Sequence, residues 1–128
     1  MAMEKREAII RNYIKAYNNF DVEGMLADFT EDIIFENIQN QVTTDSLTGK
    51  EAFREQAEQA KDFFSQRKQT IKAIKLQEDY VEIDIDYEAT LAIDFPGSIK
   101  KGEKINLQGK SIFTFNTDYK IEKLLDIS

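Results

Sequence analysis

Apolar residues at helical spacing open the chain, and the pattern occurs twice. The first set falls at positions i, i+3, i+4 and i+7: Ile10, Tyr13, Ile14 and Tyr17. The second set has the same spacing: Val22, Met25, Leu26 and Phe29. Such spacing places the side chains in one stripe along a helix, and Asp21 stands where an N-cap is expected. The pattern therefore predicts two short amphipathic helices, the first with two phenol hydroxyls on its apolar stripe.

A strand and a third helix are predicted next. Residues 33–38 alternate as a strand, with Phe35 and Asn37 on one side. Residues 39–48 are polar and rich in Asn, Thr and Ser, which predicts a surface loop. Thr48 and Glu51 have the spacing of a capping box. A helix is therefore expected from Thr48 to about residues 64–66.

Alternation with a period of two predicts long strands in the second half. The strongest signal covers residues 81–95, and about 50 Å of strand at roughly 3.3 Å per residue is expected to bend. A turn at Pro96-Gly97 is predicted after it, followed by strands over residues 104–116 and 119–127. Residues 69–76 change phase, which favours a strand with a bulge near Ala73 but leaves a short helix open.

This order of elements predicts an α+β fold in a single domain over residues 1–128. Three helices in the N-terminal half should lie on one face of a curved antiparallel sheet. A curved sheet with helices across its open side encloses a cone, whose interior is a natural place for a small-molecule cavity.

The composition excludes several kinds of chemistry. Neither His nor Cys occurs, which rules out Ser-His-Asp and Cys-His catalysis and any histidine- or thiolate-ligated metal. The formal net charge of −7 argues against binding nucleic acid, and no stretch is apolar enough for a membrane span. The N-terminus is charged where a signal peptide would be apolar, so we expect a cytoplasmic protein.

A row of acidic residues alternates along the longest predicted strand: Glu82, Asp84, Asp86 and Glu88. A strand spreads such side chains over some 20 Å, which is unlike the compact loop that calcium needs. We therefore expect no metal site and no cofactor. The row is interpreted as a solvated sheet face that lysines of neighbouring strands neutralise: Lys72, Lys75, Lys104 or Lys110.

Three segments carry a resemblance to a known superfamily. Residues 13–37, the TGKEAF segment at 48–53 and the closing strands FTFNTDYKIEKLLDIS resemble the nuclear transport factor 2-like superfamily, in its ketosteroid isomerase-like and SnoaL-like polyketide cyclase branches. The resemblance covers essentially the whole chain. It implies the cone-shaped fold and a homodimer, but no single activity, because this scaffold hosts isomerases, cyclases, dehydratases, hydrolases and adaptors.

Comparison with the steroid isomerases implies that their reaction is absent. Those enzymes use a Tyr of the first helix, a general-base Asp on the first strand and a protonated Asp on a later strand. By position these correspond to Tyr13, Asn37 and Ser111. An amide cannot take up a proton near neutral pH. Tyr13, Asn37 and Ser111 could still orient a carbonyl, or could be ordinary polar groups of the cavity wall.

The SnoaL-like cyclases imply a different acid/base group, an Asp on the final strand, for which Asp126 is the candidate. A carboxyl in an apolar cone would have a raised pKa. Alternation leaves open whether Asp126 faces the cavity or solvent. Dehydratases and epoxide hydrolases of the superfamily fit less well, because they use a His or an Asp-Arg-Asp set and no Arg follows Arg67.

Three functions remain open. The first is a module that binds a small apolar molecule; its expected contacts are Tyr17, Phe35, Asn37, Phe53, Ser111, Phe113 and Leu124. The second is a cofactor-independent cyclase, isomerase or lyase that uses Asp126 with Tyr13 or Tyr17. The third is a protein-interaction adaptor with a filled cone and an exposed apolar patch on its sheet.

Overall fold

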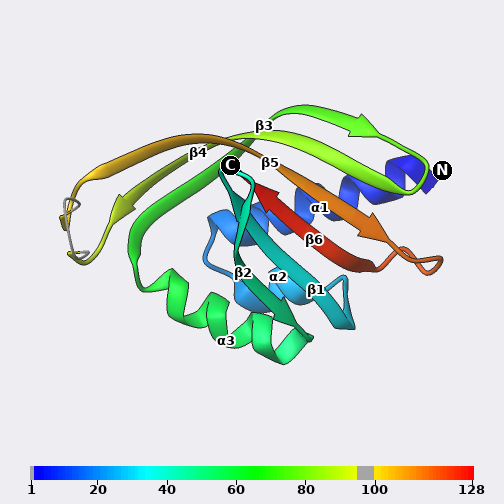
Figure 1. Cartoon of the computed structure of the whole chain (residues 1–128), viewed down its shortest axis with the longest axis horizontal. Coiled ribbons are helices and arrows are strands. Elements are labelled where there is room, and N and C mark those ends of the chain that lie inside the picture. Colours follow the sequence, from blue (N-terminus) through cyan, green and yellow to red (C-terminus); the bar gives the residue numbers. More distant parts are fainter. Residues whose placement is uncertain (1, 95–99) are drawn as a thin grey trace.

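The computed structural model describes residues 2–94 and 100–128, and these form three helices and six strands. The helices are α1 (Ala2–Asn18), α2 (Val22–Leu26) and α3 (Lys50–Lys61). The strands are β1 (Phe29–Gln39), β2 (Val42–Thr48), β3 (Phe64–Leu76), β4 (Tyr80–Leu91), β5 (Lys104–Phe115) and β6 (Ile121–Ile127). In Figure 1 the long strands β3, β4 and β5 arch over the remaining elements. The α+β prediction is confirmed.

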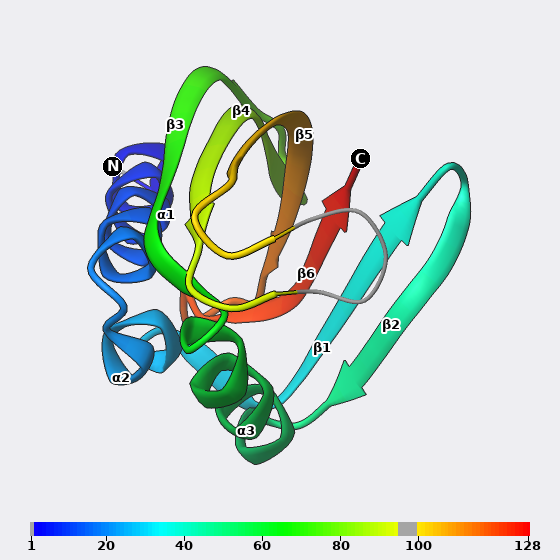
Figure 2. The same ribbon diagram turned by 90° about the vertical axis from the view of Figure 1, so that its left-hand side faces the viewer.

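All six strands form one curved sheet in the order β2-β1-β6-β5-β4-β3. β1 and β6 run parallel, whereas the other neighbours are antiparallel. The expectation of a purely antiparallel sheet was therefore wrong at one pair, because the C-terminal strand inserts beside β1 and not at the sheet edge. Figure 2 shows the helices on the inner side of the arc that the strands follow from β2 to β3.

The core fills the space between the helices and the inner face of the sheet. Its fully buried side chains come from both layers: Ile10, Leu26, Ile33, Val81, Ile83, Phe113, Ile121 and Leu124. The predicted stripe of α1 is confirmed, since Ile10, Tyr13 and Ile14 are buried. Asp21 caps α2 as predicted, and its carboxylate accepts a 3.0 Å hydrogen bond from the backbone nitrogen of Gly24.

Several predicted boundaries differ from the structure in the first half. Residues 42–48 form the edge strand β2, not a loop, and β1 begins at Phe29, which was expected in the second helix. Thr48 ends β2, and Gly49 is the N-cap of α3 with no side-chain hydrogen bond, so the capping box is absent. α3 ends at Lys61 because Phe64 already pairs with Leu91 in the sheet.

The second half follows the predicted strands more closely. The register of β3 against β4 shifts between Ile71 and Ala73, which confirms the bulge. β4 ends at Leu91, earlier than expected, and the predicted Pro96-Gly97 turn lies outside the described residues. The acidic row of β4 is partly neutralised across strands, because Glu82 pairs with Lys75 and Lys110 and Asp86 pairs with Lys72. Among the described helices, none has the length and apolar character that crossing a membrane requires.

Candidate functional site

Two hollows meet on the inner side of the sheet. One, of about 170 Å³, lies between α1, α3 and the sheet and is lined by Tyr13, Phe53 and Arg67 among others. The second, of about 240 Å³, opens toward the ends of β1, β5 and β6. Tyr17, Phe64 and Asp126 line both hollows. These three residues therefore stand at the junction of the two spaces.

Asp126 occupies the middle of a polar row across three strands. Its register partner on the parallel strand β1 is Asn37, and its partner on the antiparallel strand β5 is Ser111. Two residues earlier on β6, Leu124 is the register partner of Phe35 on β1 and of Phe113 on β5. Leu124 is fully buried, and side chains two positions apart share a face of a sheet. Asp126 therefore faces the inner side, which settles the orientation that alternation left open.

The environment of Asp126 shifts its acidity. The Oγ of Ser111 donates a 2.7 Å hydrogen bond to Oδ1 of Asp126. Burial raises the pKa of the Asp126 carboxyl to about 6, and the hydrogen bond from Ser111 opposes that rise. A carboxyl whose pKa is about 6 changes its charge near neutral pH, which is the range in which an acid/base group must work.

Phenol groups of α1 and β4 stand around this carboxyl. The Tyr13 ring stacks on Phe29 at 5.8 Å between centroids and meets the edge of Phe113 at 5.7 Å. Burial raises the pKa of Tyr13 well above its ordinary value, and the charge of Asp126 adds to the rise. The Tyr17 hydroxyl donates a 3.0 Å hydrogen bond to the hydroxyl of Tyr87. Burial also raises the pKa of Tyr17, so both α1 phenols are neutral hydrogen-bonding groups at pH 7.

Arg67 is a site residue that the sequence did not identify. It is only 6% exposed, and its Nε donates a 2.9 Å hydrogen bond to the backbone oxygen of Tyr17. Its guanidinium lies over the rings of Tyr17 and Phe20, at 3.8 and 4.5 Å from their centroids. The inward phase of β3, in which Arg67 and Gln69 are both buried, was the available signal.

Seven of the predicted site residues line the two hollows: Tyr13, Tyr17, Phe35, Asn37, Phe53, Ser111 and Asp126. Asn37 uses its amide nitrogen within the protein, donating a 2.9 Å hydrogen bond to Thr44 Oγ1. Phe113 and Leu124, predicted as ligand contacts, are both 0% exposed. Their side chains belong to the hydrophobic core, where the Tyr13 ring of α1 meets Phe113, and a ligand cannot touch them without displacing other residues.

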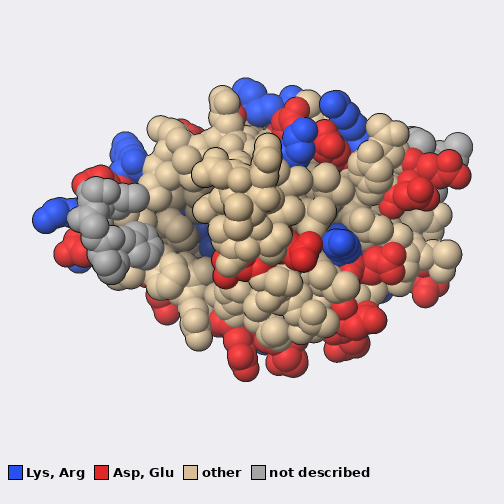
Figure 3. Space-filling model, in the orientation of Figure 1, with Lys and Arg blue, Asp and Glu red and all other residues tan. Residues whose placement is uncertain are grey.

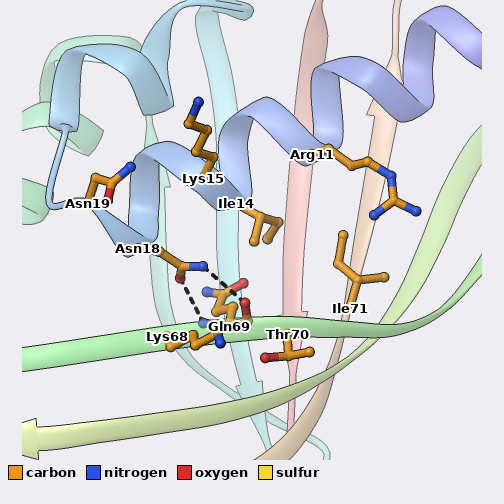
Figure 4. A pocket seen from close by; sticks show the side chains of 9 residues that line it. All are labelled: Arg11, Ile14, Lys15, Asn18, Asn19, Lys68, Gln69, Thr70 and Ile71. Atoms are coloured by element: carbon orange, nitrogen blue, oxygen red, sulfur yellow. Dashed lines mark hydrogen bonds between the residues drawn. The ribbon is translucent and has the colours of Figure 1, made fainter.

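A larger groove of about 480 Å³ lies on the other side of α1, against β3. Figure 4 shows Asn18 pointing from α1 to Gln69, with Arg11 and Lys15 farther along the same helix. The Asn18 amide donates to the backbone oxygen of Gln69 at 3.1 Å and accepts from its backbone nitrogen at 2.7 Å. This pair of bonds fixes the end of α1 on β3 and so holds Tyr17 beside Arg67.

Comparisons with known proteins agree with this architecture. Residues 10–124 match the family model of the SnoaL-like domain. Among solved structures, a proposed polyketide cyclase from Xanthomonas campestris is similar at 18% identity with a TM-score of 0.84, covering 100% of this chain and 93% of that one. AclR, a proposed hydroxylase from Streptomyces galilaeus, is similar at 21% identity with a TM-score of 0.77, covering 97% and 88%.

A third similar structure is a ketosteroid isomerase-like protein from Catenulispora acidiphila in complex with trimethylamine. It shares 14% identity with a TM-score of 0.73, covering 92% of this chain and 82% of that one. A search of curated proteins found no match. At these identities the likeness to solved structures shows the fold alone.

Proposed function

Since the chain belongs to the SnoaL-like domain family, we propose that it is a cofactor-independent proton-transfer catalyst, a cyclase, isomerase or lyase, in which Asp126 is both acid and base. The observation that carries this proposal is the position of Asp126, at the junction of two hollows with a pKa of about 6. Proposed cyclase and hydroxylase activities of similar structures support small-molecule chemistry on this scaffold.

The proposed step is removal of a proton from a carbon next to a carbonyl group. The Asp126 carboxylate takes the proton, the C–H electron pair forms a C=C bond, and the carbonyl π electrons move to its oxygen. The neutral phenol of Tyr13 donates a hydrogen bond to that oxygen as it becomes negative. Asp126, now protonated, returns the proton to another atom of the molecule, which completes an isomerisation or starts a ring closure or an elimination.

The apolar walls of the hollow support this role. Phe35 and Phe53 meet edge to face at 5.4 Å on the α3 side, and Met25 and Ala57 complete that wall. Such walls suit a small, mostly apolar molecule and keep the dielectric low around the carboxylate. The base differs from that of the steroid isomerases, because Asn37 stands in the position of their general-base Asp and Asp126 takes the proton from another strand.

The proposal is tested with 5-nitrobenzisoxazole, which reports any carboxylate base in an apolar site. The carboxylate removes the ring C–H proton, the C–H electrons form a nitrile, the N–O bond breaks and a coloured phenolate leaves. We expect a rate that rises with pH through about pH 6 and is lost in Asp126→Asn. Asp45→Asn, a change on the exposed edge strand β2, is the matched control. Equal rates in the two variants would remove Asp126 from the mechanism.

A second candidate is a module that binds such a molecule without converting it. The observation that favours it is the presence of Asn37 and Ser111 where steroid isomerases carry carboxyl groups. Native mass spectrometry of the freshly purified protein, followed by analysis of released small molecules, addresses this candidate. A bound molecule released unchanged, together with no activity on 5-nitrobenzisoxazole, would favour binding over catalysis.

We also propose that the chain forms a homodimer through the outer face or edge of its sheet. Val42 on the edge strand β2 is 61% exposed, and an exposed apolar side chain of this size gains from being covered. The same native mass spectrum reads the oligomeric state. A monomer at micromolar concentration would contradict this proposal and would leave Asp126 unaffected.

A further inference from the structure

Arg67 carries a buried positive charge whose terminal nitrogens have no acceptor among residues 2–94 and 100–128. Its Nη2 is fully buried and makes no hydrogen bond. The hydrogen bond of Nε to Tyr17 and the stacking on Tyr17 and Phe20 hold the guanidinium in place without neutralising it. A buried charge that is not paired is costly, so such an arrangement is kept where a further group completes it.

Each of the other three arginines of this protein has a hydrogen-bond acceptor for its terminal nitrogens or a carboxylate partner. Arg6, also buried, donates through its terminal nitrogens to the backbone oxygens of Gln77 at 2.8 Å and Glu78 at 3.4 Å. Arg11 pairs with Glu7 at 3.0 Å, and Arg54 pairs with Glu23 and Glu51. Within the described chain, Arg67 alone forms no ion pair and no terminal hydrogen bond. The difference does not follow from burial, because Arg6 is buried to the same degree.

Asp126 is the acidic residue that shares the smaller hollow with Arg67, yet the two do not pair. No salt bridge joins them among the described residues. Both charges nevertheless act on the phenol of Tyr13: Asp126 raises its pKa and Arg67 lowers it. The smaller hollow thus holds a cation and a carboxyl at separate places, and both act on Tyr13.

We propose that Arg67 binds a carboxylate on the small molecule that this hollow takes, so that the ligand is an organic acid with an apolar body. The single positive charge of a guanidinium balances the single charge of a carboxylate, and charge-assisted hydrogen bonds are stronger than neutral ones. A phosphate carries more charge than one Arg can balance in an apolar hollow. This inference rests on the proposed function only for the position of the reacting carbon, which a carboxylate at Arg67 would present toward Tyr13 and Asp126.

The net charge of the chain does not favour such a ligand at long range. The net charge is −7, and Figure 3 shows Asp and Glu gathered along the lower edge and at the right-hand end of this face. A field of this sign repels an anion at long range. Affinity for an acid must therefore come from a cation close to the ligand, and Arg67 is the cation that lines the smaller hollow.

The test compares 2-naphthoate with its neutral analogue 2-naphthamide by isothermal titration calorimetry. We expect the protein to bind naphthoate at least about tenfold more tightly than naphthamide, since charged hydrogen bonds are worth that much. Arg67→Gln should remove this preference and leave naphthamide binding within about twofold. Arg54→Gln, which removes one partly exposed charge, is the matched control and should keep the preference.

Three results would overturn the proposal. The first is equal affinity for the two compounds, and the second is no binding of naphthoate. The third is a folded Arg67→Gln variant whose affinities for both compounds fall by the same factor, which would indicate a structural role. If Arg67→Gln does not fold, the unmodified protein gives the answer by NMR. It has only four arginines, and naphthoate should move the Nε–H signal of Arg67 and not those of Arg6, Arg11 and Arg54.

Asp126→Asn separates this proposal from the catalytic one. The variant should retain the preference for naphthoate, or increase it, because it removes a negative charge from the same hollow. Retained preference with no activity on 5-nitrobenzisoxazole in the unmodified protein would leave an acid-binding site that is not a catalyst. Activity without the preference would leave a catalyst whose ligand is not an acid.

Discussion

Ser111 and Asp126 lie directly opposite each other on β5 and β6, and the Ser111 hydroxyl donates a 2.7 Å hydrogen bond to the Asp126 carboxylate. Ser111 is 2% exposed, so this bond forms away from competing water. It fixes one carboxylate oxygen, Oδ1, toward β5. The other oxygen makes no hydrogen bond within the described chain, which leaves it available to a ligand in the hollow.

Removing this hydrogen bond should raise the pKa of Asp126 further. The Ser111 bond favours the charged carboxylate and so lowers its pKa, whereas burial raises it to about 6. In Ser111→Ala only burial remains, and we expect the pKa of Asp126 to lie above 6. Titration of the carboxyl carbon by NMR measures it. Ser46→Ala, on the exposed strand β2, is the control, and an unchanged or lower pKa in Ser111→Ala would contradict the assignment.

Asp126 should cost the folded protein stability at neutral pH. Its folded pKa of about 6 lies above the ordinary value of 3.8, so the folded state binds more protons than the unfolded state between these values. Stability therefore falls as pH rises from about 4 to 6. Two pKa units correspond to about 3 kcal/mol, an upper limit for a partly buried group.

Asp126→Asn should therefore be more stable than the unmodified protein at pH 7, by up to about 3 kcal/mol, and about equal to it near pH 4. Urea unfolding at the two pH values measures both differences. Asp45→Asn, which removes a carboxylate from the exposed strand β2, is the control. A stability difference that is the same at pH 4 and pH 7 would mean that Asp126 titrates normally in the folded state.

Much of the fold was predictable because the residues on the buried side of a helix or strand recur at regular intervals along the sequence. The α1 stripe and the alternation of β4 both follow from contact with one core, and the resemblance of residues 13–37 indicated the superfamily. β2 was missed for the same physical reason. Apart from Leu47, its residues are exposed on both faces, so no apolar alternation marks it as a strand.

The candidate site was predictable in part. Asp126 and Tyr13 came from the resemblance. The orientation of Asp126 depends on how β6 pairs with β1 and β5, and a single sequence does not contain this strand pairing. Arg67 was missed because the third helix was expected to end at about residues 64–66 and the next strand to cover only residues 69–76. The structure begins β3 at Phe64, which places Arg67 inside the strand in the same inward phase as Gln69.

Gly49 and Thr48 provide a test of how α3 begins. Gly49 has a φ of +102°, a conformation that side chains rarely adopt, and an added Cβ would meet only Glu31 O at 3.9 Å. Gly49→Ala should therefore lose about 1 kcal/mol through backbone strain alone. Thr48→Ala should change stability by less than about 0.5 kcal/mol, because Thr48 does not cap the helix. Thermal unfolding of both variants gives the comparison, and a larger loss in Thr48→Ala would restore the capping box.

Tyr13 should matter to chemistry more than to packing. Its ring packs between Phe29 and Phe113, contacts that a Phe would keep. Its hydroxyl makes no hydrogen bond to any residue that the structure describes, and it lines the smaller hollow. Tyr13→Phe should therefore keep the unfolding temperature within a few degrees. The rate with 5-nitrobenzisoxazole should fall about ten- to a hundredfold, since the leaving oxygen loses a hydrogen-bond donor.

Tyr80→Phe, at a partly exposed position at the start of β4, is the control for loss of a phenol hydroxyl and should leave both quantities unchanged. The pH dependence adds a check, because burial and the Ser111 hydroxyl set the pKa of Asp126 and the neutral Tyr13 phenol does not. Removing the phenol should reduce the plateau rate and leave the midpoint near pH 6, since Asp126 keeps its burial and its bond to Ser111. A Tyr13→Phe variant that loses stability in proportion to rate would show that the hydroxyl acts in folding and not in the reaction.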